Sequence, residues 1–545
     1  MAAILATASA RASHRRVGMA RRGHAKRRSP WLATRAFATA AQQAVVQNVE
    51  VVRNLAPVED AATSLWRHFA EISEIPRPSG RELAVLSYIK GFAEARGLPW
   101  REDAVGNLVV CRPGSGGGED ASPVLLQGHV DMVCEKNAET VHDFEADPIR
   151  LQVEHGWLRA SGTTLGADNG VGVAAALAVL EQGSDAVLPP IEALFTVDEE
   201  TGLTGAFGLD GSLVSATRLL NLDTEEFGSI YIGCAGGGDS KLSLEAPRNP
   251  APAECSVLLR LKVQGLMGGH SGIDIHEGRG NAVLMAVALA ADALAASPHA
   301  VLVELAGGDK HNAIPREASV VIGVPPEDEV AIEAAVAKRL QALREEFGLL
   351  EKGLSASVET ASEVKAKAFS RKDASRFLAA LRLLPHGVIK MSHAMEGLVE
   401  TSNNVASITT TDEGLKVLLS TRSSLGSALE AARERLQAVA DLTGGSLVME
   451  PAYPGWAPAP ASPLLEVTRK KLKAICNEEP KILAIHAGLE CGILLEKCPT
   501  LREAVSFGPT ITGAHSPDEA LEIDTVSPFF RTVLAILAEL AAERQ

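Results

Sequence analysis

The chain has 545 residues, more than one typical domain of about 100 to 200 residues, so two domains are expected. Hydrophobic residues make up 46% and charged residues 22%, the composition of a soluble globular protein. The formal net charge of −16 becomes −25 once the nine positive charges of the first 49 residues are set aside. Such an acidic body disfavours nucleic acid and anionic membranes as partners.

The first 49 residues form a segment of unusual composition. They contain no Asp or Glu but nine Arg or Lys residues, together with many Ala and Ser residues. This is typical of an organellar transit peptide, whereas a secretory signal needs a continuous apolar core. The alternative is a basic disordered tail that binds nucleic acid. We expect a transit peptide for mitochondrion or plastid, and otherwise a cytoplasmic protein.

The cysteines and the apolar runs indicate a protein of a reducing compartment whose longest apolar run lies in the core. The seven cysteines lack the paired spacing of a zinc ribbon, and their odd number favours a reducing compartment. The longest apolar run, 282–296, is interrupted by Asp292 and is too short to span a bilayer. We therefore expect it to be a core helix.

Strands and helices alternate along the first half of the chain. Two amphipathic helices are predicted within 61–95, broken by Pro and Gly at 76–80. Further elements follow, namely strands at 108–111 and 123–127, a helix at 171–182, and strands at 191–197 and 218–222. This βαβ alternation predicts an α/β fold with a mainly parallel central sheet.

A second domain is predicted to interrupt the first. After the glycines of 231–239, the pattern predicts a strand at 259–263, a helix at 282–296, strands at 301–305 and 319–324, and a helix at 328–347. A proline-rich stretch, 451–463, resembles a return linker. The expected division is a first domain of 50–238 and 450–545 around an inserted α+β domain of 239–449. No internal repeat is apparent in the sequence.

Side chains of metal-ligand type stand at the predicted strand ends or on loops that follow them. They are His129, Asp168, Glu199, Glu200, Asp223 and, after a strand at 504–507, His515. Ligands of open α/β sheets bind at the carboxyl ends of strands, and imidazoles with carboxylates suit a two-zinc site. Singly, each residue has a structural explanation, such as Asp168 as a helix N-cap. Jointly, they favour a metal centre.

Nine segments also carry a family resemblance: QGHVDMVCEKN, TTLGADNGVGVAAALAVL, DEETGLTGAFGLD, YIGCAGGGD, GLMGGHSGIDIHEGRGNA, NAIPREA, AYPGW, HAGLECG and SFGPTITGAHSPDE. From about residue 60 onwards the chain resembles the Xaa-His, or aminoacyl-histidine, dipeptidases. These are di-zinc metallopeptidases, a family that includes carboxypeptidase G and the aminoacylases. The resemblance implies an aminopeptidase-like catalytic domain with a lid, and hydrolysis of dipeptides, preferentially those ending in histidine. A dipeptidase of broader choice or an aminoacylase is the alternative.

The resemblance also implies a set of metal ligands. Asp168 would bridge two zinc ions, for which Mn²⁺ or Co²⁺ are possible substitutes. His129 and Asp223 would complete one zinc site. Glu200 and His515 would complete the other.

Three catalytic residues are implied in the same way. Asp131 would hold the imidazole of a ligand histidine, and Glu199 would be the general base for a metal-bridging water. His270, from the inserted domain, would donate to the developing oxyanion. A non-catalytic binding protein on a hydrolase fold is the alternative, and retention of Asp131 and Glu199 beside all five ligands argues against it.

The implied partners are dipeptides, with neither nucleic acid nor membrane. Arg422 would bind the dipeptide carboxylate, because a planar guanidinium can hold both oxygens. Asn281 and Asn312 would contribute hydrogen bonds to the substrate. A homodimer through the lid is also expected.

Overall fold

The protein is described as a computed structural model covering residues 48–53, 55–56, 60–361 and 366–543. The transit peptide expected at 1–49 lies outside the described residues, apart from its last two positions.

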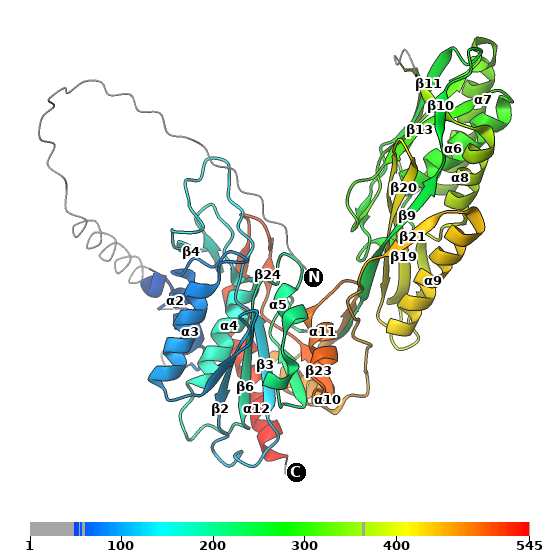
Figure 1. The fold of residues 1–545 in the computed structure, drawn as a ribbon. Helices are drawn as coiled ribbons and strands as arrows, with labels where there is room; N and C mark the ends of the chain where they lie inside the picture. The colour runs from blue at the N-terminus through cyan, green and yellow to red at the C-terminus, as the bar shows by residue number, and fades with distance from the viewer. Residues whose placement is uncertain (1–47, 54, 57–59, 362–365, 544–545) are drawn as a thin grey trace, which may run out of the picture.

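The first body is built around an eight-stranded sheet with helices on both sides (Figure 1). Its strand order is β1-β2-β6-β3-β7-β23-β8-β22. The central strands β6, β3, β7 and β23 run parallel, while β1, β2 and the β23–β8 pair are antiparallel. The predicted α/β class with a mostly parallel sheet is confirmed. The strands are β1 Trp100–Glu102, β2 Leu108–Arg112, β3 Val124–His129, β6 Ile191–Thr196, β7 Arg218–Asn221, β8 Ser229–Cys234, β22 Lys481–Ile485 and β23 Glu503–Ser506.

Helix α4, Ala167–Leu180, is buried along almost its whole length. Its alanines and glycines allow close packing, and it contacts β3 on one side and α2, Ala62–Ser73, on the other. This explains why the sequence shows a continuous apolar run here instead of an amphipathic stripe. The remaining helices of the body are α3 Leu83–Ala95, α5 Thr204–Gly208, α10 Pro463–Cys476, α11 Glu490–Lys497 and α12 Ile523–Ala542.

Helix α12 is the one helix of the described residues that is long and apolar enough to cross a membrane by length and composition. Half of its most apolar window is buried inside the protein. Phe529 and Phe530 are fully buried, and the helix packs against α2 and α10. We therefore interpret α12 as a core helix, longer than the 282–296 run that stands out in the sequence.

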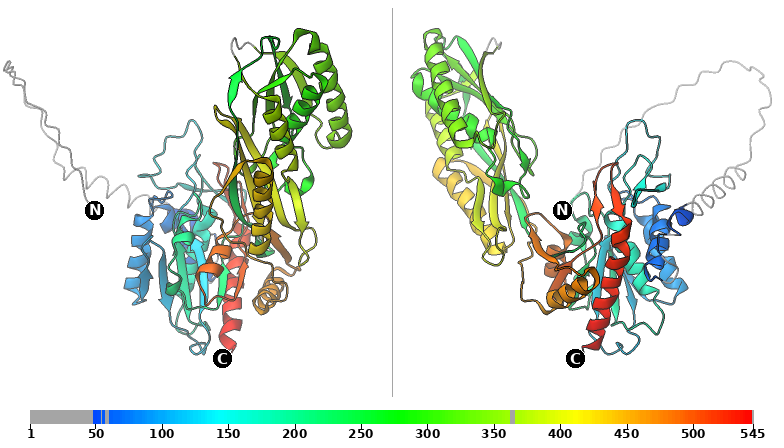
Figure 2. Two further views of the ribbon diagram at one scale, coloured as in Figure 1. Left: turned by 45° about the vertical axis from the view of Figure 1, so that its right-hand side comes forward. Right: turned by 180° about the vertical axis from the view of Figure 1, so that it is seen from behind.

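The second body contains a nine-stranded antiparallel sheet whose helices cover one face (Figures 1 and 2). Its helices are α6 Ala282–Ala296, α7 Glu329–Phe347, α8 Arg371–Leu383 and α9 Gly426–Thr443. Its strands are β9 Gly236–Glu245, β11 Val257–Gln264, β13 Val301–Gly307, β15 Ala318–Val324, β16 Ser355–Thr360, β18 Gly387–Met391, β19 Val399–Thr410, β20 Gly414–Ser423 and β21 Ser446–Met449. The helix expected at 282–296 is confirmed as α6.

This second sheet consists of two units with the same topology. The order β16-β11-β15-β13 of the first unit is repeated in reverse as β21-β9-β20-β19 in the second, and the units meet where β13 pairs with β19. Each unit carries two helices, α6 with α7 and α8 with α9. The duplication is not visible in the sequence because the second unit is discontinuous. Its strand β9 precedes the whole first unit in the chain.

The chain crosses between the bodies at two places. It enters the second sheet at β9, which begins at Gly236, and leaves it after β21, which ends at Met449. Two separate hydrophobic cores accompany the two sheets. We propose the division 50–238, 239–449 and 450–545 on this basis, and we call the second body the lid.

Candidate active site

Five residues with metal-ligand side chains converge at the carboxyl edge of the eight-stranded sheet. His129 ends β3, Asp223 follows β7, and Glu200 lies in the loop after β6. Asp168 lies in the first turn of α4. His515 lies on the loop between β24, Ile511–Thr512, and β25, Ala520–Glu522, which belong to a small sheet with β4, Leu151–Glu154, and β5, Trp157–Ala160.

Asp168 lies between two imidazoles. Its Oδ1 is 3.0 Å from His129 Nε2, and its Oδ2 is 3.2 Å from His515 Nε2. Asp223 Oδ1 is 3.5 Å from His129 Nε2, and Glu200 Oε2 is 3.1 Å from His515 Nε2. The structure thus forms two groups of possible metal ligands, His129–Asp168–Asp223 and Asp168–Glu200–His515, that share Asp168.

The polar atoms of this cluster fit divalent cations. Asp223 Oδ1 and Glu200 Oε1 are buried and have no hydrogen-bond partner. A buried carboxylate oxygen without a partner is costly, and a cation removes that cost. Imidazole nitrogens and carboxylate oxygens are ligands that Zn²⁺ accepts, and Mn²⁺ and Co²⁺ accept them too. The residues therefore suit two metal ions that share one carboxylate.

Asp131 lies beside this cluster and contacts the segments that carry two of its residues. Its buried carboxylate accepts hydrogen bonds from Ser79 Oγ at 2.7 Å and from the backbone N–H groups of Glu199 and Glu200 at 3.1 and 3.2 Å. His129 Nδ1 lies 3.4 Å from Asp131 Oδ1. Burial alone raises the pKa of Asp131, but the nearby His129 lowers it to about 2. The ionised Asp131 thus lies on the Nδ1 side of the His129 ring, while Nε2 lies beside Asp168.

Glu199 lies beside the ligand groups, and its carboxylate is close to both His129 and Glu200. Burial raises the pKa of Glu199 well above its ordinary value, and the charge of His129 opposes part of that rise. A carboxylate with a raised pKa is, in its ionised form, a stronger proton acceptor.

Two residues that the sequence analysis did not single out hold the ligand loops together. The carboxylate of Glu519 accepts four backbone N–H bonds of 2.7 to 3.2 Å from residues 165–168. Arg77, also buried, donates to the carbonyls of Val130, Asp131 and Gly166. Glu519 lies four residues after His515 in the segment SFGPTITGAHSPDE, and Arg77 lies in the helix break at 76–80. Both residues therefore stand in segments that the sequence already marks, although their partners are not apparent from it.

The lid places His270 and Arg422 apart from the metal-ligand cluster. Among the described residues, no hydrogen bond or ion pair joins either side chain to that cluster. His270, on β12 (Gly269–His270), accepts at Nδ1 from the N–H groups of Gly272 and Ile273, which leaves Nε2 to carry the proton. Burial and the charge of Arg422 lower the pKa of His270. His270 is therefore a neutral donor at Nε2.

Arg422, on β20, is buried and lacks a carboxylate partner. One nitrogen of its guanidinium donates to Tyr453 Oη at 3.2 Å, and its Nε has no hydrogen-bond partner. Within the described part of the chain it forms no ion pair. A buried guanidinium with unused donors is suited to an anionic ligand. Asn312 lies on the lid loop that follows β13, where its backbone carbonyl accepts at 2.7 Å from the N–H of Ser271, the residue after His270.

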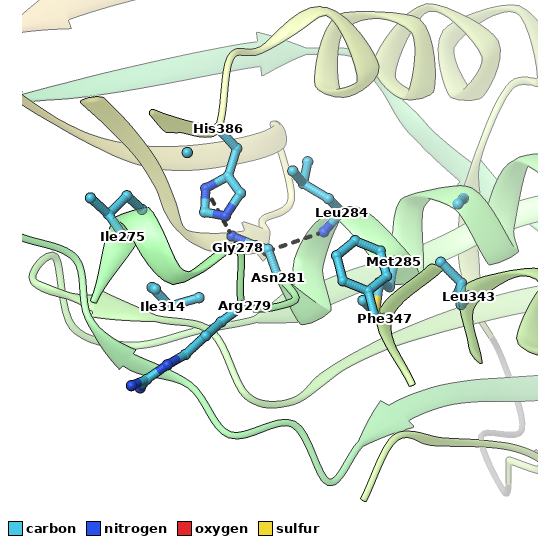
Figure 3. A pocket seen from close by; sticks show the side chains of 12 residues that line it. Ile275, Gly278, Arg279, Asn281, Leu284, Met285, Ile314, Leu343, Phe347 and His386 are labelled. Atoms are coloured by element: carbon cyan, nitrogen blue, oxygen red, sulfur yellow. Dashed lines mark hydrogen bonds between the residues drawn. The ribbon is translucent and has the colours of Figure 1, made fainter. Parts of the chain in front are cut away.

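Asn281 caps a helix of the lid. Its Oδ1 caps α6 by accepting from the N–H groups of Val283 and Leu284, and its Nδ2 donates to the Val405 carbonyl. Figure 3 shows it in the wall of a lid cavity of about 320 Å³, with His386 and apolar side chains around it. The side-chain amide of Asn281 thus has partners within the lid, and its contact with substrate stays a prediction.

Comparison with known proteins agrees with this geometry. Residues 125–539 match the peptidase family M20/M25/M40. The chain belongs to this peptidase family. It is 40% identical over 479 residues to the cytosol non-specific dipeptidase of Escherichia coli (strain K12), covering 88% of this chain and 98% of the relative. The family resemblance predicted from the motifs is confirmed.

Solved structures of family members show the same architecture. The aminoacylhistidine dipeptidase of Vibrio alginolyticus matches with a TM-score of 0.83 and 41% identity, covering 89% of this chain and 97% of that chain. The aminopeptidase PepT of Bacillus cereus matches with a TM-score of 0.50 at 16% identity, over 88% of this chain and 98% of that chain. The second likeness shows the fold alone.

Metal binding is expected to stabilise the protein and to depend on pH. Without a cation, hydrogen bonds to Asp168 and Glu200 raise the pKa of His515 to about 11, so binding must displace its proton. Apparent affinity for Zn²⁺ should therefore rise with pH, and Zn²⁺ at about 100 times its Kd should add about 2.7 kcal/mol of stability. Calorimetry in buffers of different ionisation enthalpy and thermal unfolding measure both effects. Metal addition without stabilisation would contradict the site.

Replacement of Glu519 tests whether the loop clamp matters to the metal centre. In Glu519→Gln one acceptor oxygen becomes a donor facing backbone N–H groups, so the loop that carries Asp168 should shift. We expect metal affinity or activity to fall about 10- to 100-fold. The matched control is Glu522→Gln, three residues further on, and equal metal affinity in both variants would remove Glu519 from this role.

Proposed function

We propose that the protein is a metal-dependent dipeptidase that prefers Xaa-His dipeptides and works with two zinc ions. The observation that carries the proposal is Asp168, whose two oxygens face the imidazoles of two separate ligand groups. Support also comes from the two relatives of about 40% identity, whose names are those of dipeptidases.

The metal ligands follow from the two groups that share Asp168. His129 and Asp223 would hold one ion, and Glu200 and His515 the other. Bound cations of this kind polarise the scissile carbonyl and lower the pKa of an attached water.

Glu199 is the proposed general base. It lies beside both ligand groups, and its raised pKa lets it take a proton from the attacking water and later give it to the leaving amine. Asp131 keeps the neighbouring backbone in place, because it accepts from the N–H groups of Glu199 and Glu200.

The lid supplies the remaining proposed contacts. His270 Nε2 is a free, neutral donor suited to the oxyanion that develops on the scissile carbonyl. Arg422 would hold the carboxylate of the dipeptide through its unused donors, and Asn312 stays a proposed contact. His270 and Arg422 would reach the substrate either by closure of the lid over the cluster of the same chain or from the lid of a partner subunit. The homodimer through the lid and the choice of Zn²⁺ over Mn²⁺ or Co²⁺ stay predictions.

Substrate profiling tests the proposal against its alternatives. The panel contains β-alanyl-histidine, other Xaa-His dipeptides, dipeptides without histidine, and N-acyl amino acids. We expect fastest hydrolysis of Xaa-His dipeptides, with metal content measured in the same preparation. Equal rates on all dipeptides would favour the broader dipeptidase. Faster cleavage of N-acyl amino acids would favour an aminoacylase and sink the dipeptidase assignment.

Removal of the proposed base should separate chemistry from metal binding. In Glu199→Ala we expect wild-type zinc content and a loss of kcat of about 100- to 10,000-fold, because proton transfer loses its acceptor. The control is Glu226→Ala, which removes a glutamate of the loop between β7 and β8 whose exposed carboxylate pairs with Lys481. Undiminished hydrolysis by Glu199→Ala would remove Glu199 from this role.

A further inference from the structure

A buried row of polar side chains crosses the central sheet directly below the metal-ligand cluster. Glu490, the first residue of α11, accepts at Oε2 from Gln127 Nε2 at 2.5 Å and from Thr196 Oγ1 at 2.9 Å. Gln127 Oε1 accepts from Asn221 Nδ2 at 2.6 Å. Asn221 in turn accepts from Ser506 Oγ. We call these residues, Glu490, Thr196, Gln127, Asn221 and Ser506, the polar row.

The strand register explains how the polar row forms. Gln127 lies opposite Asn221 in the β3–β7 pair, and Asn221 lies opposite Ser506 in the β7–β23 pair. Because side chains alternate along a strand, residues two apart share a face. Gln127 therefore shares its face with His129, and Asn221 lies two residues before Asp223. Thr196, in turn, lies directly opposite His129 in the β3–β6 pair.

Glu490 is the ionisable member of the polar row, and its environment is unusual. It is 1% exposed, and its Oε1 is buried without a hydrogen-bond partner. It is close enough to interact electrostatically with His129 and Asp223, and its charge raises the pKa of Glu199. A buried carboxylate that is only half satisfied costs stability, which a core of apolar side chains would avoid.

A second buried carboxylate, on the strand β6 that also carries Thr196, provides the contrast. Glu192, near the start of β6, is 5% exposed and lies at the end of the strand far from the metal ligands. Its two oxygens accept from Ser215 N, Ser215 Oγ and Ala216 N. Glu192 thus has the satisfied surroundings of a purely structural carboxylate, and Glu490 does not.

Glu490 also stands at the end of a loop that reaches the lid. Residues 486–489 precede it, and His486 Nε2 lies 2.8 Å from Ser402 Oγ on β19 of the lid. Gly272 of the lid lies so close to this loop that a Cβ there would be 2.3 Å from the His486 carbonyl oxygen. The start of α11 therefore touches both the strands that carry metal ligands and a segment in contact with the lid.

We propose that Glu490 is a positioning residue that sets the spacing of His129, Asp223 and Glu199 through the polar row. Thr196 leads into the loop of Glu199, Gln127 into His129, and Asn221 into Asp223, so a single carboxylate ties together the strand ends on which both ligand groups depend. The consequence for hydrolysis rests on the proposed dipeptidase function, whereas the consequence for metal binding does not.

Two substitutions of Glu490 test the proposal. Glu490→Ala removes the acceptor for Gln127 and Thr196, and we expect metal affinity to fall about 10- to 100-fold with an altered absorption spectrum of the Co²⁺-loaded protein. We expect kcat on an Xaa-His dipeptide to fall similarly with little change in KM, because the substrate contacts are elsewhere. Glu490→Gln keeps an acceptor for both donors, and it should restore most of the affinity and the spectrum.

Glu192→Ala is the matched control, since it removes another buried carboxylate that contacts the central sheet but lies far from the metal ligands. It should lower thermal stability but leave Co²⁺ affinity and spectrum as in the wild type. If Glu490→Ala does not fold, Thr196→Val removes one donor to Glu490 and should weaken metal affinity to a smaller extent.

Three results would overturn the proposal. They are wild-type metal affinity and spectrum in the folded Glu490→Ala or Thr196→Val variant, equal loss of affinity in Glu192→Ala, and failure of Glu490→Gln to restore them. A wild-type protein that binds metal but cleaves no dipeptide would reject the proposed function alone, and the metal readouts would still decide the role of Glu490.

Discussion

Asp168 must hold its two oxygens towards two imidazoles while three further carboxylates, Glu199, Glu200 and Asp223, crowd the same edge of the sheet. Like charges at such separations repel strongly when they are shielded from water. The fold meets this constraint in two ways. It places the groups where divalent cations can neutralise them, and it commits backbone N–H donors to the carboxylates that stay outside the ligand groups.

The carboxylates outside the ligand groups, Glu519 and Asp131, both bind backbone N–H groups of ligand loops. Glu519 takes the N–H groups of the segment before Asp168, and Asp131 takes those of Glu199 and Glu200. Each anion thereby holds a loop whose next side chain reaches the cluster. The buried Arg77 adds a positive charge between these loops and donates to their carbonyls. The geometry of the site thus depends on main-chain contacts that strand ends and tight loops supply at little entropic cost.

The duplicated lid carries the residues proposed to contact substrate and meets the catalytic body at the loop before α11. Its sheet presents Arg422 from one unit and carries His270 on a loop beside the other, and the loop before α11 contacts it through Ser402. Glu490 then connects that loop to the strand ends below the metal ligands. The short stretch 486–490 thus contacts both the lid and the strands that end in metal-ligand side chains.

The sequence by itself determined the α/β class, the central strands, the helix at 282–296 and the five residues at strand ends, because burial imposes periodicity and ligands gather at one sheet edge. The family followed from local motifs. Only the tertiary structure decided that β9 completes a second lid unit, that Asn281 caps a helix, and that Glu519, Arg77 and Glu490 hold the ligand loops. These roles depend on contacts between residues far apart in the chain, such as Gln127 and Glu490, and no local pattern encodes which distant donor a buried carboxylate meets.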